Sequence, residues 1–144
     1  ISCQIISPSI LVHNRAVMKY PSILFSTHFD ALDTTKQDIT ISDDGRVEGF
    51  VCMKSTIGVG KDDQLITLQP KSKVIGAVYT DSRISLDGTV IGTVITKDFY
   101  FYEPPTTYYG WLRSAVIDRT KLPSGYLIPP GLSENVKLDV LDWL

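Results

Sequence analysis

Residues 44–51 read DGRVEGFV and residues 87–94 read DGTVIGTV, so the pattern D-G-x-V-x-G-x-V occurs twice. Each copy follows a short β-like run, DITIS at 38–42 and RISL at 83–86. Asp-Gly after a strand is a strong hairpin signal, because glycine tolerates a positive φ angle and aspartate hydrogen-bonds the nearby backbone. The repeat therefore predicts two similar hairpins that serve as architecture rather than chemistry.

The residues that follow each Asp-Gly alternate in character. In the first copy this alternation places Val47, Gly49 and Val51 on one face of a strand, and the second copy follows the same rule. A glycine in mid-strand marks a bulge or the close approach of another backbone. Two copies are too few for a solenoid, which needs at least three stacked repeats, so we expect paired hairpins or an internal duplication.

Strand-like runs continue along the whole chain. They are short, rich in Val, Ile, Thr, Tyr and Phe, and cut by Gly, Pro, Asn and Asp; examples are residues 20–27, 73–80 and 135–143. The last of these alternates Val136, Leu138 and Val140, which favours a strand over a helix. The pattern predicts one all-β domain, an antiparallel β-sandwich or a small jelly-roll-like barrel.

Composition excludes several classes of function. The 144 residues are 43% hydrophobic and 21% charged, with a formal net charge of -2, as in a globular domain. Lys and Arg form no basic stripe, which argues against nucleic-acid binding, and no apolar run is long enough for membrane insertion. Because the sequence begins with Ile1, we expect a fragment or a processed chain.

Few residues suggest catalysis or metal binding. Asp62 and Asp63, in a Gly-rich loop, are the best candidates for Ca²⁺, although a solvated acidic turn is the simpler interpretation. His28 precedes Asp30 but has no activated nucleophile beside it, so we expect no enzyme. A β-sandwich enzyme that uses Asp62, Asp63 or His28 is a weaker hypothesis than the two binding functions given below, a self-associating domain and a carbohydrate-binding module.

Two cysteines, Cys3 and Cys52, lie in alternating apolar segments. Their spacing to other ligand types does not suggest a metal site. A disulfide and two buried thiols both fit the sequence, and buried thiols in a reducing compartment are the simpler interpretation.

The most unusual segment is DFYFYEPPTTYYGWLR at 98–113. Tyr and Trp at this density suit an interface or a carbohydrate platform, because they offer large rigid area with a polar tip. A strand with alternate aromatics in the core is the competing interpretation. The candidate contact residues are Tyr100, Tyr102, Tyr108, Tyr109 and Trp111.

Four short motifs, in order, resemble the protruding domains of nodavirus capsid proteins. They are the strand–turn–strand DITISDDGRV at 38–47, the Gly-rich loop IGVGKDD at 57–63, and the closing strands GWLRSAVID at 110–118 and GYLIPPG at 125–131. The resemblance implies an antiparallel β-sandwich or small barrel that projects from a viral shell.

The same resemblance implies a function. Residues 1–8 would be a hinge from a preceding shell domain, and residues 9–144 the protruding domain on the virion surface. The domain would self-associate as a homodimer or homotrimer, bind a host-cell receptor or glycan, and hold Ca²⁺ at Asp62 and Asp63. The alternative function is a carbohydrate-binding β-sandwich module.

Overall fold

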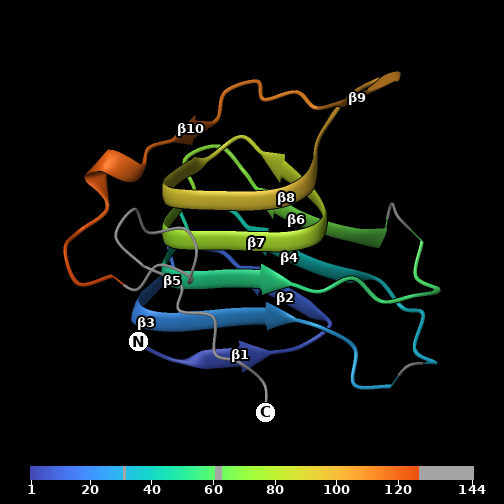
Figure 1. The fold of residues 1–144 in the computed structure, drawn as a ribbon, viewed down its shortest axis with the longest axis horizontal. Coiled ribbons are helices and arrows are strands. Elements are labelled where there is room, and N and C mark those ends of the chain that lie inside the picture. Colours follow the sequence, from blue (N-terminus) through green and yellow to red (C-terminus); the bar gives the residue numbers. More distant parts are fainter. Residues whose placement is uncertain (31, 61–62, 127–144) are drawn as a thin grey trace, which may run out of the picture.

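The strands build one large, mostly parallel sheet (Figure 1). A computed structural model describes residues 1–30, 32–60 and 63–126. Within them, only β8 and β9 pair in antiparallel fashion. The strands are β1 (Gln4–Ile6), β2 (Ser9–Val12), β3 (Val17–Ser26), β4 (Gln37–Ile41), β5 (Arg46–Met53), β6 (Gln64–Leu68), β7 (Lys73–Leu86), β8 (Thr89–Glu103), β9 (Thr106–Tyr109) and β10 (Val116–Ile117).

The sheet winds round in coils that make two facing walls. One wall stacks β1, β3, β5 and the first parts of β7 and β8, while β2, β4, β6 and the later parts of β7 and β8 stack in the other. β7 is long enough to bend from one wall into the other. The chain is therefore a parallel β-solenoid whose sheet nearly closes on itself.

The predicted antiparallel sandwich or jelly-roll-like barrel is wrong, although the described chain is all-β. The Asp-Gly turns do not fold a strand back onto its neighbour. They carry the chain from one wall to the other, and the next strand pairs with the strand one coil earlier: Val47 pairs with Met18, and Val90 with Val74. The prediction of two hairpins fails for the same reason. A third copy of the V-x-G-x-V core, at 74–78, completes the stack.

Identical or similar apolar side chains stack from coil to coil between the walls. Ile10, Ile39, Ile66 and Ile84 form one such column, in which each residue is in register with the next and all are buried. The predicted alternation after the first Asp-Gly is confirmed, since Val47 and Val51 are fully buried. Burying a Val, Leu or Ile side chain stabilises by about 1.5–3 kcal/mol, so these columns supply the main driving force.

A second column contains almost no side chain. Gly49, Gly76 and Gly92 are in register, with φ angles of 139°, 138° and 143°. A Cβ atom at Gly76 would lie 2.0 Å from the carbonyl oxygen of Gly49, and one at Gly92 would lie 1.7 Å from that of Gly76. Close approach of another backbone, predicted from the mid-strand glycine, is confirmed.

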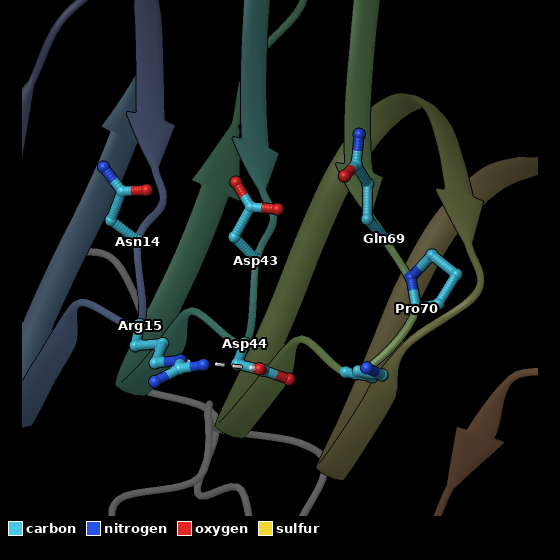
Figure 2. Close-up of a pocket in the computed structure, with 7 residues that line it drawn as sticks. Asn14, Arg15, Asp43, Asp44, Gln69 and Pro70 are labelled. Carbon is cyan, nitrogen blue, oxygen red and sulfur yellow. Dashed lines mark ion pairs between the residues drawn. The ribbon is translucent and has the colours of Figure 1, made fainter.

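The turns between walls also stack (Figure 2). Positive φ angles occur at Asn14, Arg15, Asp43, Asp44 and Lys71, so in the second of these turns the two aspartates rather than Gly45 take the left-handed conformation. Asn and Asp tolerate this region better than other side chains. Gly45 is needed for space instead, because a Cβ there would lie 2.9 Å from the Ser42 carbonyl oxygen.

Glutamines close the opposite corners of the coils. Gln37 and Gln64 are in register and buried. Gln37 Nε2 donates to the carbonyl oxygens of Ser26 and Lys54, at 3.0 and 2.6 Å. These bonds tie the base of the loop in one coil to the next coil, and satisfy carbonyl groups that leave the ladder.

The last coil is covered by the chain that follows it. β10 pairs with the start of β8, and Asp118 then caps a 3-10 helix, η2 (Arg119–Lys121). The segment after η2 runs back along the wall (Figure 1), and its Tyr126 ring lies 4.2 Å from the ring of Tyr20. The Tyr126 hydroxyl donates to Glu48 Oε2 at 3.1 Å.

Candidate functional site

The β8–β9 hairpin extends beyond the last coil and carries the aromatic residues (Figure 1). Its turn is Pro104-Pro105, and Phe101 pairs with Tyr108 while Tyr100 pairs with Tyr109. Residues directly opposite in an antiparallel pair point to the same side of the ribbon. The hairpin therefore divides its aromatic residues between two faces.

One face forms an apolar hollow, which we call the Phe101 face. The ring centroids of Phe101 and Tyr108 are 5.9 Å apart, and those of Tyr108 and Trp111 are 5.6 Å apart. The interplanar angles of 30° and 41° make a tilted row of rings. These side chains, with Glu103, Leu112 and Arg113, line a hollow of about 410 Å³.

A charged pair lies at the rim of this hollow. Arg113 Nη1 donates to Glu103 Oε1 at 3.5 Å, and the Arg113 guanidinium lies 5.3 Å from the Phe101 ring centroid. Both side chains are more than half exposed. The rim therefore presents a carboxylate acceptor beside guanidinium donors, with no net charge between them.

The other face of the hairpin anchors it to the solenoid. The guanidinium of buried Arg83, on β7, lies 5.5 Å from the Tyr100 ring and 5.8 Å from the Tyr109 ring. The two tyrosine rings meet edge to face, 6.1 Å apart. Cation–π contacts of this kind fix the hairpin's position. Tyr102, on the same face, is exposed.

The structure thus brings Tyr108 and Trp111 together and separates them from Tyr100, Tyr102 and Tyr109. Sequence reasoning named these five residues but missed Phe101, Glu103 and Arg113 as lining residues. Counting outward from the Pro-Pro turn pairs residue 101 with 108, and this register was the signal available in the sequence.

The predicted calcium site remains a prediction. Asp62 lies outside the described residues, and the Asp63 backbone N–H donates to the Gly60 carbonyl oxygen at 2.9 Å, as in a turn. Among the residues that the structure describes, no three His, Cys, Asp or Glu side chains gather so that they could hold a metal ion. The strand predicted over Val136, Leu138 and Val140 also lies outside the described residues.

His28 is part of the loop framework. Its ring is almost fully buried, with Nδ1 3.0 Å from the Thr56 hydroxyl and Nε2 3.9 Å from Asp33 rather than from Asp30. Thr56 also donates to the Gln37 side chain at 3.1 Å. These contacts link the corner loops of two coils.

Both cysteines are free thiols. Cys3 packs against the core of the first coil, and Cys52 lies on the outer side of β5. Burial raises the pKa of the Cys52 thiol, because a thiolate is poorly stabilised away from water. No helix in the described ranges is long and apolar enough to cross a membrane.

A larger hollow, of about 610 Å³, runs along the stacked turns (Figure 2). Its lining is polar, and Arg15 and Asp44 form an ion pair between neighbouring turns, with Nε and Oδ2 3.9 Å apart. Asn14, Asp43 and Gln69 come from successive turns of the stack. The hollow lacks an apolar floor, so the hairpin is the better candidate for ligand binding.

The edge of the first coil is a second candidate surface. β1 and β2 end the strand order on the two walls, and no strand of the described chain pairs with their outer sides. Ile5 is 36% exposed and Leu11 61% exposed. Residues 1–12 contain no charged side chain.

No protein-family model, curated protein or solved structure matches the chain significantly. The nodavirus resemblance remains untested, while the antiparallel sandwich that it implied is not the fold observed.

Proposed function

We propose that the chain is a non-catalytic assembly module that self-associates through the edge of its first coil. The observation that carries this proposal is the open edge of β1 and β2, which has neither a neighbouring strand in the described chain nor a charged side chain. Natural proteins usually block such edges with charges, proline or bulges, because exposed backbone groups pair with other chains. Here Pro8 lies between the strands and leaves both edges available.

The partner that fits this edge is a second copy of the chain. At the other end of the solenoid, β10 covers the start of β8 and β9 covers its end, so that end offers less open edge. Head-to-tail stacking is thereby disfavoured, whereas two first coils can meet across a twofold axis. Such an isologous contact closes on itself and gives a dimer rather than a filament.

Sedimentation equilibrium over a wide concentration range tests the proposal. The wild-type chain is expected to form a reversible dimer. The double variant Ile5→Lys/Leu11→Lys is expected to be monomeric, because lysines on an edge strand oppose pairing. Ile95→Lys is the matched control, since Ile95 is similarly exposed but lies on β8.

Either of two results contradicts the proposal: a wild-type chain that is monomeric at every concentration, or a double variant that associates as the wild type does. Circular dichroism must show that the variants are folded, which we expect because substitutions at exposed positions usually change stability by less than about 0.5 kcal/mol. Repeating the experiment with Ca²⁺ and with a chelator tests the metal prediction separately.

Location on a virion surface and attachment to a host receptor remain predictions from the sequence resemblance alone. The solenoid geometry supports only the self-association part of that expectation.

A further inference from the structure

The Phe101 face has the construction of a small ligand site. Its volume of about 410 Å³ lies within the range of about 300–1,000 Å³ that is usual for ligand pockets. Phe101 and Tyr108 lie side by side in its lining, and Trp111, which is 62% exposed, lies beside Tyr108. The hairpin is held by Arg83 on its opposite face, so these rings are presented by a fixed support.

We propose that this hollow binds a neutral oligosaccharide, with Trp111 and Tyr108 as the surface on which a sugar ring stacks. A pyranose ring presents a flat face of C–H groups and an edge of hydroxyl groups. The tilted row of aromatic rings can pack against the C–H face, since aromatic side chains give large apolar contact area. The Glu103–Arg113 pair at the rim can hydrogen-bond to the hydroxyl groups at the edge of the sugar.

The rim chemistry favours an uncharged ligand. A hydroxyl group both donates and accepts, so neighbouring hydroxyls can donate to the Glu103 carboxylate and accept from the Arg113 guanidinium. Hydrogen bonds to ionised groups are stronger than those between neutral groups. A sugar can therefore satisfy both members of the pair at once.

The same rim disfavours charged ligands. The Arg113 guanidinium already lies over the Phe101 ring, so an incoming cation cannot use that aromatic face without displacing it. For an anion, repulsion by the Glu103 carboxylate offsets attraction by the Arg113 guanidinium, because the pair has no net charge. A proline-rich peptide, the other usual ligand of aromatic grooves, offers carbonyl acceptors but no prolyl N–H donor for Glu103.

Titration against neutral oligosaccharides tests the inference. The probes are cellohexaose, xylohexaose, maltohexaose and chitin hexaose, with tetramethylammonium and a decaproline peptide as competing classes. Binding is followed by isothermal titration calorimetry and by Trp111 fluorescence in a Trp143→Phe background, which leaves Trp111 as the only tryptophan.

We expect saturable binding of at least one neutral oligosaccharide. Trp111→Ala should weaken it by about tenfold or more, because the stacking surface is lost. Glu103→Gln should weaken it less, since the amide keeps an acceptor. Tyr102→Ala is the matched control on the opposite face, where an exposed tyrosine is removed without loss of affinity.

The inference is overturned if no oligosaccharide saturates the chain, if only tetramethylammonium or decaproline binds, or if Trp111→Ala binds as well as the wild type. Sugar binding does not depend on the proposed dimerisation, because the edge variant Ile5→Lys/Leu11→Lys should bind the sugar as the wild type does. Failure of dimerisation and failure of sugar binding are therefore distinguishable.

Discussion

The glycine column makes the sharpest prediction about stability. In Gly76→Ala, the new methyl group would lie 2.0 Å from the Gly49 carbonyl oxygen, so the coils must separate locally. The backbone φ angle of 138° adds strain of about 1–3 kcal/mol for a residue other than glycine. Forcing atoms into a packed site costs a further 1–3 kcal/mol or so, which gives a total loss of about 2–6 kcal/mol.

Gly110→Ala separates the two contributions. Gly110 also has a positive φ angle, 73°, but nothing lies within 4 Å of a Cβ atom placed there. It should therefore lose only the conformational part of the free energy of unfolding. Urea denaturation followed by circular dichroism measures both variants. If Gly76→Ala is no less stable than Gly110→Ala, steric contact between coils does not explain the glycine column.

Two further predictions concern the covering segment, η2 and the residues after it. Tyr126→Phe removes a donor from Glu48, which is only 7% exposed, and should lower the free energy of unfolding by about 1 kcal/mol at neutral pH. Burial alone would raise the pKa of Glu48, but hydrogen bonds from Tyr126 and the Tyr20 backbone, with nearby Arg46 and Lys19, hold it below its ordinary value. The stabilisation is therefore present above the unfolded pKa and disappears as the pH falls through the folded pKa, so the deficit of the variant in urea denaturation should shrink in acid; a deficit independent of pH would contradict this. The hydrogen bond from the Thr120 hydroxyl, together with Lys121, lowers the pKa of Asp118 to about 2. An NMR titration should therefore show that this carboxyl protonates well below the ordinary range of aspartate. Thr120→Val should raise the titration midpoint of Asp118, and an unchanged midpoint would rule out the Thr120 hydrogen bond as the cause.

Local features of the fold were predictable from the sequence, because they depend on neighbouring residues. Alternation placed Val47 and Val51 on one face of a strand, which is the buried face, and the mid-strand position of Gly49 indicated close backbone approach. The strand partners were not predictable in the same way. Short runs cut by turn residues occur in sandwiches and solenoids alike, and the third copy at 74–78 lacks the Asp-Gly that marks the other two.

The candidate site shows the same limit. Aromatic density in residues 98–113 located the hairpin, but it did not show which rings share a face. Tyr108 and Tyr109 are adjacent in sequence and lie on opposite faces, while Arg83 reaches the hairpin from another coil. Arg113 was overlooked because its partner Glu103 lies across the Pro-Pro turn.

At the corners closed by Gln37 and Gln64, the number of residues that connect the two walls can differ between coils while the strands keep their register. The connections from β3 to β4 and from β5 to β6 have the same length, residues 27–36 and 54–63, and Gln37 and Gln64 are in register. In the following coil β7 crosses with no excursion, and Ser82 donates to the Gln64 carbonyl oxygen at 2.9 Å. The connection at this corner can therefore lengthen or shorten without disturbing the hydrogen-bond ladders between strands. We expect sequence insertions to be tolerated there, and a foreign peptide inserted at this corner could be displayed on a selected coil of the solenoid.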